Sequence, residues 1–242
     1  MTVLLMAGTG DGKALAKALA DTNVEAIASL AGTTRTPDPL PLPSRVGGFG
    51  GADAFRNYLA ANAITAVVDA THPFASRITA RTCAICRQVG IPYLHLLRPE
   101  WAPVPGDRWH FIDTEEEAAT LISPGQTVFL GTGRQTLAKF ANLVGCRVIC
   151  RQIDPPDGPF PFPGGEFLVG RPPFPVVDEI ALFERLGVDW LVVKNAGGEA
   201  SRTKLTAARA KQIPVVMINR PPMPQAERVE TVAAAMEWVA RL

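Results

Sequence analysis

The stretch that decides the fold reads Val3-Leu4-Leu5-Met6-Ala7-Gly8-Thr9-Gly10-Asp11-Gly12. An apolar run ends in three glycines at every second position, and the helical pattern of residues 13–20 follows at once. This order is typical of a buried parallel strand, a tight turn and a helix whose first N–H groups point at a ligand. The spacing is G-x-G-x-G and not the regular G-x-G-x-x-G. A nucleotide phosphate site and a turn that merely requires small residues therefore both remain open here.

A second strand pattern, residues 24–30, is followed by Ala31-Gly32-Thr33-Thr34-Arg35. In a dinucleotide-binding unit an acidic residue near this point accepts the ribose 2′-OH of NAD. Here Ser29, the two threonines and Arg35 take that place, and such groups suit a 2′-phosphate that a carboxylate would repel. The segment favours NADP over NAD, although a polar loop with an incidental arginine would look the same.

Composition restricts the function classes. The chain has 242 residues, enough for one large or two small domains, and 47% of them are hydrophobic. A net charge of +1 gives no field that attracts nucleic acid or an acidic membrane. No secretory pattern precedes the first strand, and no apolar run has the length of a membrane span. We therefore expect a cytoplasmic protein with no nucleic-acid or membrane partner. We also expect a monomer.

Four cysteines offer a second possible chemistry. Cys83 and Cys86 fall in a helical pattern, and Cys146 and Cys150 lie around a strand. Four thiolates can bind zinc, but reduced and buried thiols that pack as small apolar groups are the commoner case. We predict no metal site.

Strand and helix patterns alternate along the chain, which indicates parallel sheets wrapped by helices. We expect strands at 65–70, 93–97, 127–130, 147–151, 190–193 and 214–218. We expect helices at 52–61, 74–89, 115–122, around 137–139, and at 176–186, 201–211 and 228–241. Residues near 98–108 are a candidate linker, and the proline-rich segment 154–175 is either a lid or, as we favour, a packed surface loop.

Two further segments stand where ligands bind in open α/β sheets, at the carboxyl ends of strands. Thr71-His72-Pro73-Phe74 follows the strand at 65–70, and His72 is either a site residue or a capping residue. Gly131-Thr132-Gly133-Arg134 follows the strand at 127–130 and repeats the Gly8-Thr9-Gly10 pattern. The repetition hints at two similar α/β halves.

Together these motifs resemble one family, the precorrin-6A reductases of cobalamin biosynthesis. The matching segments are Gly8 to Gly12, Ser29 to Arg35, Val46 to Gly50, Asp69 to Ala75, Gly131 to Arg134, Lys194-Asn195-Ala196-Gly197-Gly198 and Val216 to Pro222. They run in the family's order over nearly the whole chain. Ala196 departs from the small hydroxyl residue common in relatives, which puts one hydrogen bond in doubt.

The resemblance implies an α/β protein of two Rossmann-like domains with mainly parallel sheets flanked by helices, facing across a cleft. Residues 1–98 would form the NADPH-binding domain, and residues 99–242 a second α/β domain that contributes to substrate binding. The enzyme would use NADPH to reduce one double bond of the precorrin-6A macrocycle, a polycarboxylated tetrapyrrole, to give precorrin-6B. A reductase or epimerase of another small substrate, and a nucleotide sensor without catalysis, are the alternatives.

The expected site residues lie at strand ends and helix starts. The cofactor would contact Gly8, Thr9, Gly10, Asp11, Gly12, Ser29, Ala31, Gly32, Thr33, Thr34, Arg35, Gly47, Gly48, Phe49, Ala70, Thr71 and Pro73. The substrate would contact Arg77, Gly131, Thr132, Gly133, Arg134, Arg151, Asn195, Gly197 and Gly198, with Arg171, Lys204 and Arg220 as further cations. His72 and Lys194 are the catalytic candidates, since both can donate a proton or stabilise developing charge.

Overall fold

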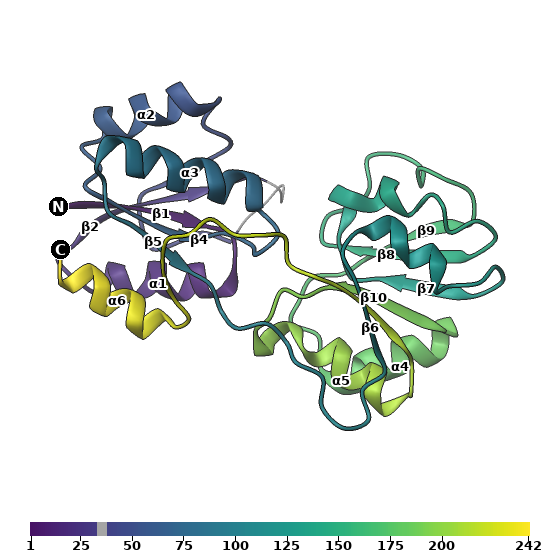
Figure 1. Cartoon of the computed structure of the whole chain (residues 1–242). Coiled ribbons are helices and arrows are strands. Elements are labelled where there is room, and N and C mark those ends of the chain that lie inside the picture. The colour runs from purple at the N-terminus through teal and green to yellow at the C-terminus, as the bar shows by residue number, and fades with distance from the viewer. Residues whose placement is uncertain (33–37) are drawn as a thin grey trace. The chain divides into compact units, whose positions relative to one another are not determined.

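The computed structural model describes residues 1–32 and 38–242, and it divides them into two compact units. Unit 1 comprises Met1–Pro99 and Pro221–Leu242, and unit 2 comprises Glu100–Arg220. Each unit contains one six-stranded sheet (Figure 1). Every strand pair recorded in the described residues is parallel. The expected class, two α/β units with parallel sheets flanked by helices, is confirmed.

Unit 1 has the strand order β12-β5-β4-β1-β2-β3. Its strands are β1 (Thr2–Ala7), β2 (Glu25–Leu30), β3 (Ser44–Val46), β4 (Ala66–Ala70), β5 (Tyr93–Leu96) and β12 (Glu227–Val229). Its helices are α1 (Gly10–Ala20), α2 (Ala52–Ala61), α3 (Ser76–Val89) and α6 (Val232–Ala240).

The apolar run of β1 is buried on both faces of this sheet. Leu5 packs in a cluster with Leu15 of α1 and Trp238 of α6. Leu4 packs in the opposite cluster with Phe55 of α2. Figure 1 shows the same layering, with α1 and α6 on one face and α2 and α3 on the other. A central strand covered on both sides explains why its sequence is continuously apolar rather than alternating.

Unit 2 has the strand order β6-β11-β10-β7-β8-β9. Its strands are β6 (Trp109–Ile112), β7 (Thr127–Leu130), β8 (Arg147–Gln152), β9 (Gly165–Val169), β10 (Trp190–Lys194) and β11 (Val215–Ile218). Two α-helices, α4 (Val176–Leu186) and α5 (Thr203–Ala210), pack on one face through Phe183 and Leu205. The 3₁₀ segments are η1 (Glu115–Thr120), η2 (Arg134–Phe140) and η3 (Glu199–Ser201).

The two sheets have exchanged their last strands, which corrects the expected domain boundary. Both sheets follow the doubly wound order 3-2-1-4-5-6, but β12 from the chain end takes the edge beside β5, and β6 takes the edge beside β11. The prediction that residues 99–242 form one domain is therefore wrong for the C-terminal segment, which belongs to unit 1. The predicted helix 228–241 likewise begins only at Val232, because Glu227–Val229 pairs with β5.

Other differences concern short elements. The predicted helices near 115–122 and 137–139 are 3₁₀ segments, and the helix predicted from 74 begins at Ser76. The predicted helix 201–211 is the shorter α5, preceded by η3. The proline-rich segment 154–175 includes β9, and its Phe160 ring packs against Phe162 and Phe167 with centroids 4.8 Å apart in each pair.

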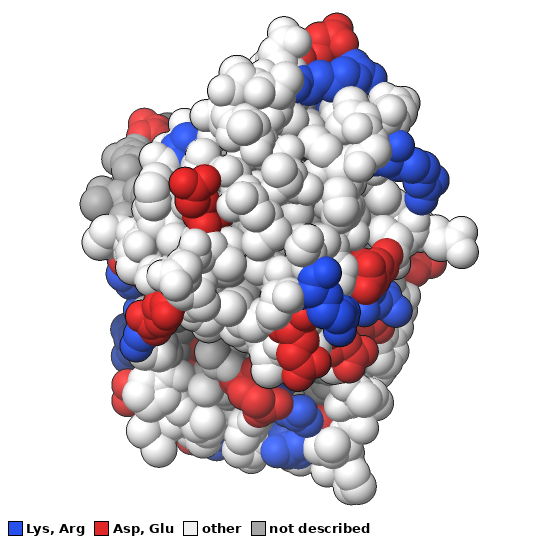
Figure 2. Space-filling view, turned by 90° about the vertical axis from the view of Figure 1, so that its left-hand side faces the viewer, with Lys and Arg blue, Asp and Glu red and all other residues white. Residues whose placement is uncertain are grey.

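The charged side chains of one face, the helix lengths and the cysteines can each be described from the structure. Figure 2 shows one face, on which Lys and Arg side chains are interspersed with Asp and Glu. Among the helices of the described chain, none has the length and apolar character needed to cross a bilayer. All four cysteines are buried and free, and burial raises the pKa of Cys150 to about 11 and that of Cys86 to about 12. Within residues 1–32 and 38–242, no group of His, Cys, Asp and Glu is placed to hold a metal ion.

Candidate functional site

The turn between β1 and α1 is held by Thr9, the N-cap of α1. The Thr9 hydroxyl accepts a hydrogen bond from the Gly12 amide (3.1 Å) and donates one to the Ala70 carbonyl at the end of β4 (2.9 Å). One side chain thus caps the helix and joins the carboxyl ends of two neighbouring strands. The remaining N–H groups of the first turn of α1 are left to a ligand or water.

The glycines of this turn differ in the space around them. A Cβ added at Gly12 would lie 3.3 Å from the Ala70 Cβ and 3.4 Å from the Ala7 Cα, so this glycine allows α1 to pack closely on the sheet. A Cβ at Gly10 would meet nothing within 4 Å among the described atoms. Open space in front of helix N–H groups is what a phosphate requires, and the turn therefore fits the pyrophosphate of a nicotinamide dinucleotide.

A second loop, Thr71 to Pro73 after β4, lies against the first. A Cβ at Gly8 would be 3.4 Å from the Thr71 Cα and 3.5 Å from the His72 amide nitrogen. The buried Asp69 fixes this loop, because its carboxylate accepts hydrogen bonds from the Thr71 amide (3.0 Å) and the Thr71 hydroxyl (2.7 Å). The Tyr93 hydroxyl donates to the other oxygen (2.9 Å).

His72 is exposed at this loop, whereas Pro73 is buried. The His72 Nδ1 atom accepts a hydrogen bond from the Phe74 amide (3.2 Å), so the ring helps to form the turn before α3. This contact matches the capping interpretation of His72.

Asp11 lies in the first turn of α1, and its carboxylate would repel a phosphate if it were unpaired. The Arg98 guanidinium, which follows β5, lies 2.8 Å from the Asp11 carboxylate. This ion pair neutralises the negative charge at the mouth of the turn.

The carboxyl ends of β2 and β3 bring together a second group of predicted cofactor residues. The Gly47 amide donates to the Leu30 carbonyl (2.8 Å), and a Cβ at Gly32 would lie 3.3 Å from a methyl group of Val46. Gly48 and Ala31 are exposed beside them. Phe49, in contrast, is buried in the core against Phe55. Its packing anchors the loop after β3 to the core.

Three of the cofactor predictions at this edge, Thr33, Thr34 and Arg35, lie outside the described residues. Ser29 is described and buried, and its hydroxyl accepts a hydrogen bond from Arg45 (2.8 Å). The Ser29 hydroxyl is therefore hydrogen-bonded to Arg45, a residue that was not among the predicted cofactor residues.

The carboxyl edge of the unit 2 sheet carries the predicted substrate residues. Gly131 directly follows β7, and a Cβ there would lie 3.1 Å from a methyl group of Val193 and 3.4 Å from the Lys204 Cδ atom. Thr132 and Gly133 follow at the start of η2, where Gly133 has a positive φ of 72°. Arg134 extends from this point and pairs with Asp157 (3.3 Å).

Lys194, at the end of β10, belongs to a network of polar groups. Its Nζ atom donates to the Thr136 hydroxyl (3.1 Å) and lies 3.6 Å from the Glu115 carboxylate. Lys139 donates to the other oxygen of Glu115 (3.1 Å). Burial lowers the pKa of Lys194, and the Glu115 carboxylate opposes this shift. The arrangement places an ammonium donor at the sheet edge with its position fixed by two partners.

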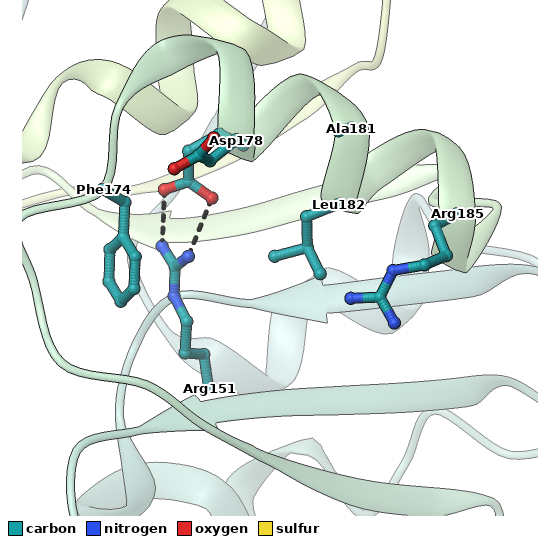
Figure 3. Close-up of a pocket in the computed structure, with 7 residues that line it drawn as sticks. Arg151, Phe174, Asp178, Ala181, Leu182 and Arg185 are labelled. Atoms are coloured by element: carbon teal, nitrogen blue, oxygen red, sulfur yellow. Dashed lines mark hydrogen bonds and ion pairs between the residues drawn. The ribbon is translucent and has the colours of Figure 1, made fainter.

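Arg151 is held inside unit 2. Both terminal nitrogens of its guanidinium donate to the buried Glu179 carboxylate, at 2.7 and 2.8 Å (Figure 3). Phe174 lies against the guanidinium, 4.0 Å from ring centroid to carbon, and together with Leu182 and Arg185 these groups line a pocket of about 370 Å³. Arg151 was predicted to bind a substrate carboxylate. In the structure, both terminal nitrogens of its guanidinium already donate to the Glu179 carboxylate.

The loop after β10 is fixed by Trp101. The Asn195 side chain accepts from the Trp101 amide (2.8 Å) and donates to its carbonyl (3.2 Å), and the Gly198 carbonyl accepts from the indole N–H (3.0 Å). Gly197 and Gly198 have positive φ values of 67° and 84°. Asn195 therefore positions this loop, and its carbonyl also accepts from Arg220 (2.8 Å).

The other predicted cations are spread around unit 1 and unit 2. Arg77 is exposed on the first turn of α3, and Arg171 is exposed in the loop before α4. Lys204 is half-buried at the start of α5 and donates to the Ser201 carbonyl (2.7 Å). Burial lowers the pKa of Lys204 to about 8.

Sequence reasoning missed four residues that organise these edges: Arg45, Asp69, Arg98 and Glu115. Asp69 is a carboxylate in an otherwise apolar strand, and that contrast is the sequence signal that could have identified it. Arg45 immediately precedes the quoted Val46–Gly50 segment. The partners of Arg98 and Glu115 are distant in sequence, so no local pattern identified them.

The fold and the turn together define a class: a protein of two doubly wound α/β units, the first with a turn suited to a dinucleotide phosphate. The family model described as precorrin-6x reductase CbiJ/CobK matches residues 2–240. The precorrin-6A reductase of Rhodococcus erythropolis is 47% identical over 244 residues, covering 99% of this chain and 98% of the relative. That of Mycobacterium tuberculosis strain H37Rv is 44% identical over the same shares.

A solved structure described as CobK precorrin-6A reductase superposes with a TM-score of 0.95 at 36% identity, covering 100% of this chain and 96% of that one. The chain therefore belongs to the precorrin-6x reductase CbiJ/CobK family, as the resemblance predicted. It is an oxidoreductase that acts on a CH–CH bond, and membership is consistent with a nicotinamide cofactor.

Proposed function

We propose that this protein reduces one double bond of precorrin-6A to give precorrin-6B in cobalamin biosynthesis, with NADPH as the hydride donor. The observation that carries the proposal is similarity to precorrin-6A reductases over essentially the whole of both chains. The similarity extends over both units of the chain. It is therefore a similarity to the whole reductase and not only to a nucleotide-binding fold that unrelated enzymes share.

The residues of unit 1 fit the cofactor. The turn from Gly8 to Gly12 would hold the pyrophosphate on the first N–H groups of α1, and the Thr9 hydroxyl keeps that turn against β4. Gly32, Gly47 and Gly48, at the ends of β2 and β3, would accommodate the adenosine end. When bound, NADPH supplies the hydride, and the protein contributes binding and orientation.

The carboxyl edge of unit 2 supplies groups for the substrate. Precorrin-6A carries many carboxylates, and Arg134 is a cation near a glycine turn that pairs with the exposed Asp157. Lys194 holds an ammonium group in a fixed position and is the first candidate for stabilising charge or donating a proton. His72 is the second candidate, through the ring nitrogen that does not accept from Phe74.

The test is spectroscopic. Purified protein is incubated with NADPH and precorrin-6A, and absorbance is followed at the nicotinamide band, with reactions lacking enzyme or tetrapyrrole as controls. Loss of nicotinamide absorbance that requires both supports the proposal, and NADPH binding without oxidation would favour the sensor alternative. Oxidation with another substrate only would identify a different reductase. Cell fractionation and gel filtration test the proposed cytoplasmic location and monomeric state.

A further inference from the structure

Arg45 lies on β3, and its cross-strand neighbours on β2 and β1 are close to the phosphate turn. It is in register with Ser29 of β2, which is itself in register with Met6 of β1, two residues before Gly8. Two strand spacings of about 4.8 Å place Arg45 roughly 10 Å across the sheet from β1. In doubly wound units the adenosine ribose binds at this position, at the carboxyl end of the second strand.

The guanidinium of Arg45 is held in one orientation. Its Nη1 atom donates to the Ser29 hydroxyl (2.8 Å) and to the Gly47 carbonyl (2.8 Å), and its Nη2 atom donates to the Gly48 carbonyl (2.9 Å). One face of the group stacks on Phe49, 4.0 Å from the ring centroid. A guanidinium has five N–H donors, so these three bonds leave donors available for a ligand.

The described hydrogen-bond partners of the Arg45 guanidinium carry no negative charge. Its hydrogen-bond acceptors are a hydroxyl and two carbonyls, and no carboxylate of the described residues lies within ion-pair distance of it. Two other basic residues of unit 1, Lys13 and Arg98, do pair with carboxylates, those of Asp38 and Asp11. A half-buried, oriented arginine with uncharged partners at a nucleotide edge is suited to an anion.

We propose that Arg45 is the specificity residue for NADPH, and that its guanidinium binds the 2′-phosphate of the adenosine ribose. The inference rests on the proposed use of NADPH. It does not depend on Arg35, which the sequence analysis selected for the same task. It also gives a reason for the Gly47 and Gly48 carbonyls to point at Arg45, because they fix the group before the ligand arrives.

The experiment measures the dissociation constants of NADPH, NADH, 2′,5′-ADP and 5′-AMP by calorimetry for the wild type and for three variants. Arg45→Ala removes the guanidinium, Arg45→Lys keeps a charge without the fork, and Arg56→Ala is the matched control. Arg56 is a basic residue of the same unit that pairs with Asp53 on α2 (2.6 Å). Thermal unfolding of each variant reports whether the fold is retained.

For Arg45→Ala we expect the affinities for NADPH and 2′,5′-ADP to fall by about tenfold to a hundredfold, as for one lost charged hydrogen bond. The affinities for NADH and 5′-AMP should change less than about threefold, Arg45→Lys should be intermediate, and Arg56→Ala should bind as the wild type does.

Equal losses for phosphorylated and unphosphorylated ligands would overturn the inference and assign Arg45 a purely structural role, with the proposed reaction unaffected. A wild type that binds NADPH and NADH equally would overturn it together with the proposed cofactor. Failure of precorrin-6A reduction alone would overturn the proposed function and leave these binding differences in place.

Discussion

Gly10 and Gly12 stand two residues apart in the phosphate turn, but their substitution should have different effects. A side chain at Gly10 would enter open space in front of α1, and the backbone there does not have a positive φ. A side chain at Gly12 would press on Ala70 and Ala7 at 3.3–3.4 Å. We expect Gly10→Val to impair cofactor binding and Gly12→Val to impair stability.

The magnitudes follow from these contacts. A valine at position 10 would displace a phosphate from at least one helix N–H group, and a lost charged hydrogen bond costs about 1.5–3 kcal/mol, or tenfold to a hundredfold in affinity. A valine at position 12 overpacks a close contact between α1 and the sheet, which typically costs about 1–3 kcal/mol. For a chain of this size that is a decrease of about 2–12 °C in Tm.

The assay combines a fluorescence titration with NADPH and a thermal unfolding curve for each variant. The expected result for Gly10→Val is weakened NADPH binding with a Tm within about 2 °C of the wild type. Unchanged NADPH affinity in Gly10→Val would refute the reasoning and show that the glycines serve only the turn. A loss of Tm in Gly10→Val equal to that in Gly12→Val would refute it as well, because a Cβ at Gly10, unlike one at Gly12, would meet nothing within 4 Å among the described atoms.

Three other predictions follow from contacts in the two units. Arg134→Ala and Lys194→Ala should reduce precorrin-6A turnover at least tenfold while changing the dissociation constant of NADPH by less than about twofold, since both residues lie in unit 2; parallel losses of both properties would contradict the proposed roles. Asp69→Asn should lower the free energy of unfolding by about 1–3 kcal/mol, because an amide cannot accept all the hydrogen bonds now made to the carboxylate, and an unchanged denaturation midpoint would argue against this. Burial lowers the pKa of Lys204 to about 8, so between pH 8 and the ordinary lysine value of 10.5 the unfolded chain binds more protons than the folded chain. The free energy of unfolding should therefore gain a rising contribution across this window that Lys204→Met lacks, and identical pH profiles of wild type and variant in urea denaturation would show that Lys204 titrates normally.

The parts of the fold that were predictable carry local signals. The run from Val3 to Ala7 is continuously apolar, three glycines follow it, and Leu15 and Leu19 give α1 a buried stripe. These features specify strand, turn and helix without distant information. Thr9 and Ala70 were both selected, but the hydrogen bond between them is a property of neighbouring strand ends.

The parts that were not predictable depend on pairing. β3 and β12 have three residues each, and in Ser44–Val46 and Glu227–Val229 no apolar run marks a strand. Their extended form is stabilised by backbone hydrogen bonds to β2 and β5, which only the folded sheet supplies. The position of Arg45 could not be predicted for the same reason, since it follows from the register of β3.

β5 pairs with β12, a strand that is synthesised only after the whole of unit 2. Residues 100–226, which include the whole of unit 2, are synthesised after β5 and before β12. At about 5–20 residues per second this takes roughly 6–25 s, during which the backbone N–H and C=O groups along one edge of β5 lack their final partner. An open strand edge can pair with another nascent chain, so the exchanged strand makes this interval a period of aggregation risk and a point at which a chaperone would act. A protein shortened before Glu227 would keep that open edge for its whole lifetime.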